Sequence, residues 1–371
     1  MSIRSIITLL LLVVFFSWSF SVKDAAEELS YSNPKIMKVH TGFISSFFMY
    51  ENHNLYACGN NSKYHLGYPK SSSQYLPVKV MEKVNNLAAG EYHTLILKTD
   101  GTLWAVGNND FGQLGNGNNN NQNTPIPIAT DVIEIATGKN FSFFIKNDHT
   151  FWAMGNNTFG QLGNGSTDNQ TTPIKILDDV KSVSAAAAHT LILKTDGTLW
   201  SCGNNSAYQL GDGTDQHKST PVKIATDVVQ MSAGNQFSIF LKTNGKLYGV
   251  GFDGAGQLGD NSIYTVHHPK EILSGVKEAV AGYGHTLALK TDGTLWAAGL
   301  NNFGQLGNGN STNLGRFEKV ADNVKQASAG NYHTLMLKND GTVWSTGSNG
   351  SGQLGTGTGL SDRNTFEQVK F

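Results

Sequence analysis

Short runs of alternating apolar and polar residues, separated by turns rich in glycine, asparagine and aspartate, fill most of this chain. Residues 84–128 contain four such runs, VNNLAA, TLILK, TLWAV and PIPI. Period-two alternation bounded by turn formers predicts β-strands, and proline in the last run suits an edge strand because proline donates no ladder hydrogen bond. Asp100 and Gly101, between the second and third runs, predict a tight type I′ hairpin. We therefore expect four consecutive antiparallel strands.

The same unit recurs at a fixed interval along the sequence. Residues 107–117 read GNNDFGQLGNG, and the first glycine of this motif recurs every 48 residues, at Gly59, Gly107, Gly155, Gly203, Gly251, Gly299 and Gly347. Four short strands per repeat, in seven repeats, are typical of a β-propeller. We expect an all-β, seven-bladed propeller over residues 35–371, with four antiparallel strands per blade. Large aromatic residues, expected to pack between neighbouring blades, occur at Tyr56, Trp104, Trp152, Trp200, Tyr248, Trp296 and Trp344.

The motif resembles the repeat of a known family. GNNxFGQLG, preceded by GxxHTL and DGTLW, is similar to the repeat of the regulator of chromosome condensation family. The resemblance covers about residues 35–371 and implies a seven-bladed propeller. It also implies an alternative function, guanine-nucleotide exchange or GTPase regulation, the role of the family's best-known member. The first copy departs most, because residues 59–67 read GNNSKYHLG and lack the second glycine and the glutamine.

The N-terminal segment does not follow the repeat. Arg4 precedes an apolar run at residues 6–16, and the small residues Ser19 and Ser21 follow it. A cationic start, a short apolar core and a small-residue exit are typical of a secretory signal peptide. We expect residues 1–21 to direct export and residues 22–34 to form a linker. The alternative is an uncleaved membrane anchor, the one case in which we expect contact with a membrane. Both interpretations place the propeller outside the cytosol.

Charge and cysteine content narrow the function classes. The chain has 27 Lys and Arg against 28 Asp and Glu, so it lacks the basic footprint of a nucleic-acid-binding protein. Cys58 and Cys202 occupy the same repeat position, three repeats apart, and so lie nearly opposite in a ring of seven. A disulfide needs Cα atoms within about 7 Å, so both cysteines are expected to be free and buried. We expect a monomer.

No catalytic or metal-binding constellation emerges from the motifs. Four histidines occupy one repeat position, but a serine and two phenylalanines fill it in the other copies, so we interpret them as packing residues: His93, His189, His285 and His333. Neighbouring copies are also too far apart for Zn–N bonds of about 2 Å. The aspartates of the Asp-Gly turns are turn formers, and nucleophile and phosphate-loop motifs are missing from the sequence. We expect no enzymatic activity, no cofactor and no bound metal.

Three functions therefore compete: an exported interaction module, a guanine-nucleotide exchange factor and an enzyme. The enzyme hypothesis has no supporting residues. In the exchange factor, as the resemblance implies, an extra hairpin outside the repeat pattern opens the GTPase. The unbroken 48-residue spacing leaves no room for such an insertion between Gly59 and Gly347. We therefore favour an exported, non-catalytic propeller that binds an unidentified protein partner.

Strand order predicts which surface binds that partner. The turn from first to second strand and the loop from third to fourth strand share one face, whereas the Asp-Gly hairpins share the other. The first face has the longer and more varied loops, where binding residues concentrate. Its expected partner-binding residues are Phe43, Tyr92, Lys139, Asn140, Gln236, Tyr283 and Tyr332, supported by Tyr264 and His267 in the outer loop at residues 262–268. Alternatively, the tyrosines only cap the blade ends.

Overall fold

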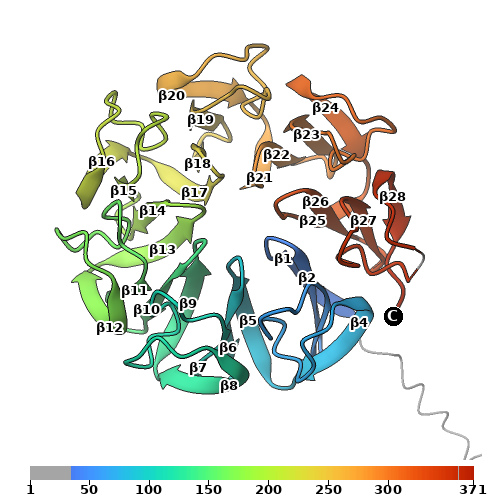
Figure 1. The fold of residues 1–371 in the computed structure, drawn as a ribbon. Coiled ribbons are helices and arrows are strands. Elements are labelled where there is room, and N and C mark those ends of the chain that lie inside the picture. Colours follow the sequence, from blue (N-terminus) through green and yellow to red (C-terminus); the bar gives the residue numbers. More distant parts are fainter. Residues whose placement is uncertain (1–34, 358) are drawn as a thin grey trace, which may run out of the picture. The chain divides into compact units, whose positions relative to one another are not determined.

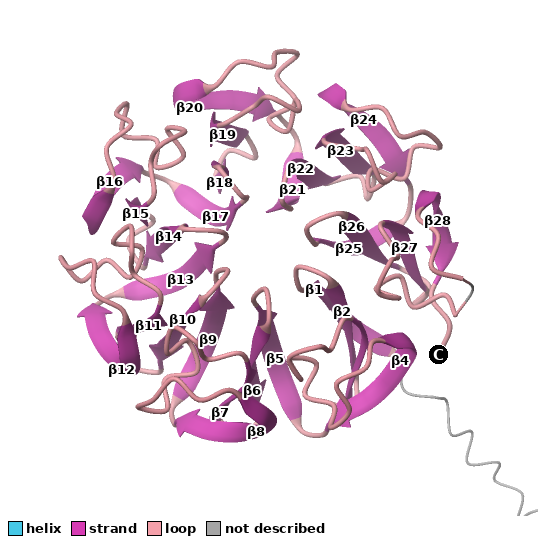
Figure 2. Cartoon of the chain, in the orientation of Figure 1, coloured by secondary structure: helices cyan, strands magenta, loops and turns pink. Residues whose placement is uncertain are grey.

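The computed structural model describes residues 35–357 and 359–371. The predicted signal peptide and linker, residues 1–34, lie outside the described residues. From Lys35 onward the chain forms one compact unit of seven four-stranded antiparallel sheets arranged around a common axis (Figure 1). The predicted all-β, seven-bladed propeller is confirmed, and the described residues contain only strands, turns and loops (Figure 2).

Each blade uses four consecutive strands, innermost first. Blades 1 and 2 are β1 (Ile36–Thr41), β2 (Ser45–Tyr50), β3 (Leu55–Gly59), β4 (Gln74–Met81), and β5 (Val84–Ala89), β6 (His93–Lys98), β7 (Leu103–Gly107), β8 (Gln122–Ala129). Blades 3 and 4 are β9 (Val132–Thr137), β10 (Phe141–Lys146), β11 (Phe151–Gly155), β12 (Gln170–Leu177), and β13 (Val180–Ala185), β14 (His189–Lys194), β15 (Leu199–Gly203), β16 (Lys218–Ala225). Blades 5, 6 and 7 are β17 (Val228–Ala233), β18 (Phe237–Lys242), β19 (Leu247–Gly251), β20 (Val266–Leu273), then β21 (Val276–Ala281), β22 (His285–Lys290), β23 (Leu295–Gly299), β24 (Leu314–Ala321), and β25 (Val324–Ala329), β26 (His333–Lys338), β27 (Val343–Gly347), β28 (Arg363–Gln368).

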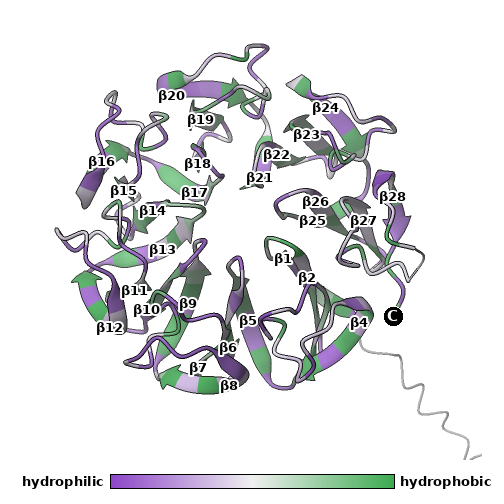
Figure 3. Ribbon diagram, viewed as in Figure 1, coloured by the Kyte–Doolittle hydropathy of each residue, from purple (hydrophilic) through white to green (hydrophobic). Residues whose placement is uncertain are grey.

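The hydrophobic core is divided into clusters between adjacent blades. Between blades 1 and 2, for example, Phe47 and Leu66 pack with Ile96, and the half-buried Trp104 covers them. The aromatic residue of every repeat joins such a cluster, as expected. Figure 3 shows apolar residues gathered in the strands and polar residues in the connecting loops. Because each blade buries both faces of its sheet against a neighbour, the ring as a whole supplies the core.

The hairpins between second and third strands differ from the type I′ turn that the sequence predicts. The Gly101 N–H donates to the Lys98 carbonyl (3.1 Å), and the Lys98 N–H donates to the Thr102 carbonyl (2.9 Å), so three residues form the loop. Gly101 has φ of 79°, whereas Asp100 does not have a positive φ. This is a type I turn followed by a left-handed glycine. Asp100 favours it because its Oδ1 accepts from the Thr102 N–H (3.0 Å) and hydroxyl (2.7 Å).

The glutamine and leucine of the motif close the loop that follows each third strand. Gln113 Oε1 accepts from the Phe111 N–H (2.9 Å), and its Nε2 donates to Asn108 Oδ1 (2.7 Å). Leu114 is fully buried beneath them. The divergent first copy keeps the buried leucine as Leu66 but has His65 in place of the glutamine. Its Tyr64, like Tyr208 in blade 4, adopts the left-handed φ of about 60° at a position where the other copies have glycine.

The ring closes without exchange of strands between the first and last blades. β1 to β4 and β25 to β28 form separate sheets, which meet through side chains. The Thr41 N–H donates to Ser328 Oγ (3.0 Å), and the Phe371 ring packs edge-on against Phe48 with 5.0 Å between centroids. Closure therefore depends on the same lateral packing that joins every other pair of blades.

Both cysteines are free and buried, as predicted. Each thiol lies near a backbone carbonyl of the preceding blade, at 3.7 Å for Cys58 and 3.6 Å for Cys202. Burial raises the pKa of both thiols, that of Cys202 to about 12. Because the thiolate is the reactive form, both cysteines are structural residues.

Candidate interaction face

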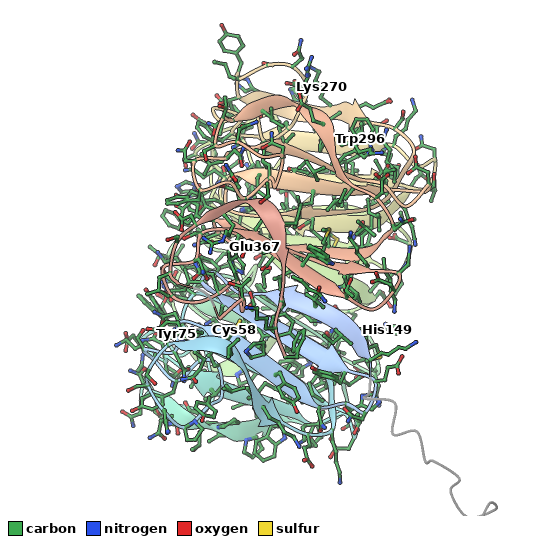
Figure 4. All side chains as sticks on the ribbon, turned by 90° about the vertical axis from the view of Figure 1, so that its right-hand side faces the viewer. Cys58, Tyr75, His149, Lys270, Trp296 and Glu367 are labelled. Atoms are coloured by element: carbon green, nitrogen blue, oxygen red, sulfur yellow. The ribbon has the colours of Figure 1, made fainter. Side chains whose placement is uncertain are left out.

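The antiparallel sheets place their connections on two opposite faces, as the strand order predicts. The turns from first to second strand and the loops from third to fourth strand form what we term the loop face. The three-residue hairpins and the blade-to-blade links form the hairpin face. Figure 4 labels Tyr75 at the start of β4 on the loop side and His149 in a hairpin on the opposite side.

The inner ring of the loop face is held rigid by hydrogen bonds between blades. The Lys139 N–H donates to the Ala186 carbonyl (2.7 Å), and the Asn331 N–H closes the ring by donating to the Phe43 carbonyl (3.2 Å). The Tyr283 N–H likewise donates to the Gly330 carbonyl (3.3 Å). These bonds fix the turns that carry the predicted residues, so their side chains project from a preorganised scaffold.

A cavity of about 310 Å³ lies inside this ring, at the mouth of the central channel. Phe43, Tyr283 and Asn331 line its rim, and small side chains such as Ala88 and Ser184 line its wall. His40 also lines the cavity, and burial lowers the pKa of this histidine to about 4. The cavity is therefore neutral and mixed in polarity.

The structure brings some of the predicted residues together and separates others. The rings of Tyr283 and Tyr332 pack with centroids 5.2 Å apart, and Phe303 packs on Tyr332 at 5.0 Å. Tyr92 lies on blade 2 instead, where its ring meets the edge of His65 at 5.7 Å. Of the predicted aromatic residues, Tyr283 and Tyr332 therefore form one cluster on blades 6 and 7, whereas Phe43 and Tyr92 lie on blades 1 and 2.

The polar members of the predicted set are spread around the same ring. Lys139 is exposed and forms an ion pair with Glu91 of the preceding blade (3.4 Å). Asn140 and Gln236 are half-buried, and their carbonyls accept from the N–H groups of Asn156 and Phe252, both at 2.9 Å. Asn140 and Gln236 therefore stabilise the turns through their backbone carbonyls, and their side chains take no part in these hydrogen bonds.

The prediction for His267 is wrong in its placement. His267 lies in β20 rather than in an outer loop, and its ring stacks on Tyr208 of blade 4 with 3.8 Å between centroids. β20 is eight residues long and begins at Val266, three residues before Pro269, so it already includes His267. Tyr264 does lie in the loop and is 78% exposed.

Sequence reasoning missed several exposed apolar residues near the tyrosine cluster. Phe252 and Ile263 in the loop from β19 to β20, and Phe303 in the loop from β23 to β24, are all exposed. We define the aromatic sector as Phe252, Ile263, Tyr264, Tyr283, Phe303 and Tyr332, all on the loop face of blades 5 to 7. The sequence could have pointed to Phe252, because this residue departs from the repeat: asparagine occupies its position in the first four copies.

The neighbouring loops of the same face satisfy their own polar groups. In blade 2 the exposed Asn119 side chain donates to the Asp110 carbonyl (2.8 Å), and Asn118 Oδ1 accepts from the Asn120 N–H (2.8 Å). In blade 3 the Ser166 hydroxyl donates to Asp168 (2.8 Å). These loops use their polar groups internally, in contrast to the apolar side chains of the aromatic sector. Exposed apolar residues also occur on this face in blades 1 and 7, at Tyr75, Leu76 and Leu360.

The hairpin face is regular and offers little variety. Its aspartates bind the threonine two residues later, and these hydrogen bonds lower the pKa of each carboxyl: Asp100, Asp148, Asp196, Asp292 and Asp340. The threonine hydroxyl in turn accepts from the tryptophan ring, as Thr294 does from Trp296 Nε1 (2.8 Å). The turns therefore use their polar groups internally.

The equivalent histidines lie between blades and bind hydroxyl groups. His93 Nε2 lies 2.8 Å from Ser142 Oγ, and His333 Nε2 lies 3.1 Å from Ser46 Oγ. All four are fully buried. Over the described residues, no group of three or more His, Cys, Asp or Glu side chains could hold a metal ion, and no helix in that part is long and apolar enough to cross a membrane.

Family models account for most of the chain. The model described as RCC1-like domain matches residues 19–272. The chain belongs to the RCC1-like domain family. Models of the regulator of chromosome condensation (RCC1) repeat match further parts of this RCC1-like propeller, at residues 276–305 and 324–353 and at residues 292–337. The resemblance seen in the repeat motif is thereby confirmed.

Solved structures share the fold of this RCC1-like chain. Human WBSCR16 is 22% identical, with a TM-score of 0.74 over 82% of this chain and 87% of that chain. Prp20p from Saccharomyces cerevisiae, a protein with binding properties to Gsp1p and histones, is 21% identical, with a TM-score of 0.78 over 91% and 88%. The ectodomain of the receptor kinase ACR4 from Arabidopsis thaliana is 14% identical, with a TM-score of 0.51 over 85% and 96%. No curated protein matches this sequence.

Proposed function

We propose that this RCC1-like propeller is an exported, non-catalytic module that binds a protein partner through the aromatic sector of its loop face. The observation that carries the proposal is the packed cluster that the exposed Tyr283 and Phe303 form with the half-buried Tyr332 on the loop face. Exposed aromatic residues on a rigid scaffold provide large contact area at low entropic cost, which is what binding hot spots require.

Charge and local chemistry support an interaction role over catalysis. The titratable side chains that line the cavity, His40 and Tyr283, form no pair of nucleophile and base. The pKa of Tyr332 is raised by burial and by the neighbouring Tyr283, which keeps its hydroxyl neutral. A neutral aromatic surface favours a partner that presents apolar side chains within a polar rim.

The test is comparative capture. The immobilised full chain and its variants are exposed to culture medium and envelope fractions, and retained proteins are identified by mass spectrometry. Alanine at Tyr283 or Tyr332 should weaken binding of the retained partner by at least about 1–2 kcal/mol. Thr294→Ala, on the hairpin face, is the matched control and should leave affinity unchanged. A partner whose affinity falls only with Thr294→Ala contradicts the proposed face.

Tyr92→Ala distinguishes a partner that covers the whole channel mouth from one that binds the aromatic sector alone. Tyr92 lies on blade 2, away from the packed cluster. If the partner covers the channel mouth, this change weakens binding as much as Tyr332→Ala does. If it binds the aromatic sector alone, affinity stays within about 0.5 kcal/mol of the wild type.

Exchange of guanine nucleotides is the second candidate, because the family includes such regulators. The described strands all belong to the seven blades, and the extra GTPase-opening hairpin implied by the resemblance is not among them. We therefore expect no acceleration of fluorescent nucleotide release from a Ran-type GTPase at micromolar propeller. Large stimulation would establish the exchange function in place of the interaction module.

Export is part of the proposal and rests on the residues that precede the propeller. The run at residues 6–16 and the serines after it predict cleavage near residue 21. The fold is compatible with this location, since the similar domain of ACR4 is an ectodomain. N-terminal sequencing of secreted protein should yield a chain beginning near Val22. Native cytosolic protein that retains Met1 would refute export.

A further inference from the structure

The loop after the third strand is built around one buried asparagine amide in most blades. In blade 2, Asn109 Oδ1 accepts from the Leu114 N–H (2.9 Å). Its Nδ2 donates to Asn116 Oδ1 (2.9 Å) and to the carbonyls of Asn118 (2.8 Å) and Asn120 (3.2 Å). Three acceptors therefore converge on one NH₂ group. The same arrangement recurs at Asn157, Asn205 and Asn301.

Blade 5 replaces this amide with an acid. Asp253 occupies the position of Asn109, and Asp260 occupies that of Asn116. Asp253 is fully buried, and its Oδ1 still accepts from the Leu258 N–H (2.8 Å). Its Oδ2 stands where the NH₂ group lies in other blades and has no hydrogen-bond partner. Asp260 Oδ1 is also buried without a partner, so the loop has gained an acceptor and lost its donor.

The two carboxyl groups interact with each other. Burial raises the pKa of Asp253 to about 7; the hydrogen bond from the Leu258 N–H opposes this shift, and the neighbouring Asp260 adds to it. The second oxygen of Asp260 is held by Lys270 Nζ at 2.7 Å, and the Asp260 side chain is only 3% exposed. Lys270 is labelled at the outer rim in Figure 4. Two close, buried carboxylates are costly unless a positive charge or a proton lies between them.

A single proton shared by Asp253 and Asp260 would replace only part of the missing asparagine NH₂ group, which donates to three acceptors in the other blades. In the other blades the amide serves a side-chain oxygen and two backbone carbonyls. At the same repeat positions in blade 5, the carbonyls belong to Ser262 and Tyr264. On this repeat equivalence, the two carbonyls and the two carboxylates make up an all-oxygen set, which is the donor set that hard divalent cations prefer.

We propose that Asp253 and Asp260 are ligands of a calcium-type divalent cation in the loop between β19 and β20. The backbone carbonyls of Ser262 and Tyr264 and solvent water complete the oxygen shell. Calcium suits the site better than magnesium because it tolerates irregular coordination by six to eight oxygens. Lys270 opposes the added charge, so we expect a dissociation constant of about 10⁻⁴ to 10⁻³ M, as in extracellular calcium modules. This site stands independently of the proposed interaction function.

The test uses the full chain, treated with chelator and then titrated with CaCl₂ at pH 7.5. The thermal unfolding midpoint should rise with calcium over the millimolar range and should rise less with magnesium. Terbium should bind in place of calcium and luminesce when excited through Tyr264, whose carbonyl is a proposed ligand. Added calcium should displace that signal.

Two variants make the test specific. Asp253→Asn restores the arrangement of the other blades, so it should abolish both calcium effects and make the cation-free protein more stable than the wild type. Asn205→Asp in blade 4 creates a matching acid pair, because Asp212 there is likewise held by a lysine, Lys218 (3.4 Å). This variant should gain a second calcium-dependent increase in stability.

Two results overturn the proposal. One is an equal calcium response in the wild type and in Asp253→Asn. The other is no calcium response, with the cation-free wild type gaining stability relative to Asp253→Asn as pH falls from 7 to 5. The latter would show that Asp253 and Asp260 share a proton.

Discussion

His189 Nε2 of blade 4 lies 2.9 Å from Ser238 Oγ of blade 5. The serine hydroxyl donates its hydrogen to the Gln209 carbonyl at 2.7 Å, so it must accept from the histidine. This assigns the Nε2-protonated tautomer to His189. The chain of hydrogen bonds runs from one blade to the next and back, and it links the second strand to the motif loop. The histidine is therefore part of the blade interface.

Replacing His189 with phenylalanine should make the protein less sensitive to acid. Burial lowers the pKa of His189 from 6.5 to about 4, so below pH 6.5 the unfolded chain binds a proton that the folded chain rejects. The wild type therefore loses stability as pH falls towards 4. Phe141 and Phe237 occupy this position in blades 3 and 5, so the ring fits. Between pH 7.5 and pH 5, the variant should gain about 2 kcal/mol relative to the wild type.

Urea unfolding at the two pH values measures this difference. The other titratable groups are the same in both proteins, so their contributions cancel in the comparison. At pH 7.5 the variant should be destabilised by about 1 kcal/mol, the net value of the lost hydrogen bond. The same pH dependence in the variant and the wild type would show that folded His189 takes up a second proton and becomes positively charged by pH 5.

His65→Gln should stabilise the propeller. His65 stands at the position of Gln113, is fully buried, and has no partner for either ring nitrogen. A glutamine there can accept from the Lys63 N–H and donate to Asn60, as Gln113 does with its equivalents. Satisfying these groups should raise the free energy of unfolding by about 1–2 kcal/mol. Denaturant titration at pH 7.5 measures the change, and Gln113→His, the reverse exchange in blade 2, should lower stability by a similar amount.

Two glycine substitutions should differ sharply in cost. A Cβ on Gly107 would lie 2.3 Å from the Tyr92 carbonyl oxygen and 2.9 Å from His93 Cα, whereas one on Gly293 meets no atom within 4 Å. Both glycines have a positive φ. Gly293→Ala should therefore cost only the conformational penalty of about 1–2 kcal/mol. Gly107→Ala must also move the backbone and should cost more than about 3 kcal/mol. Similar unfolding midpoints for the two variants would contradict the close approach.

The thiols should be unreactive until the protein unfolds. Cys58 and Cys202 are both fully buried, and burial raises the pKa of each thiol. A maleimide at pH 7.5 should label neither cysteine in the native protein and both after denaturation, as counted by intact mass. Rapid labelling of the folded chain would show that the interfaces between blades open readily.

The sequence determines the blade because its signals are local. Alternating apolar residues define each strand, turn residues separate the strands, and the 48-residue spacing repeats them seven times. The loop face, the free cysteines and the packing role of the repeated aromatic residues follow from strand order and repeat position. The hairpin type was misjudged because a hydrogen bond from Thr102 to Asp100 favours a three-residue loop over the Asp-Gly turn.

Tertiary structure decides what depends on neighbouring blades. Tyr283 and Tyr332 are 49 residues apart, and the lateral spacing of blades 6 and 7 sets the contact between their rings. His267 was misplaced because its partner, Tyr208, belongs to another blade. The exchange of asparagine for Asp253 is visible in the sequence. Its consequence, two unpaired carboxylate oxygens in a buried loop, appears only in the folded chain, because burial removes the water that would otherwise solvate them.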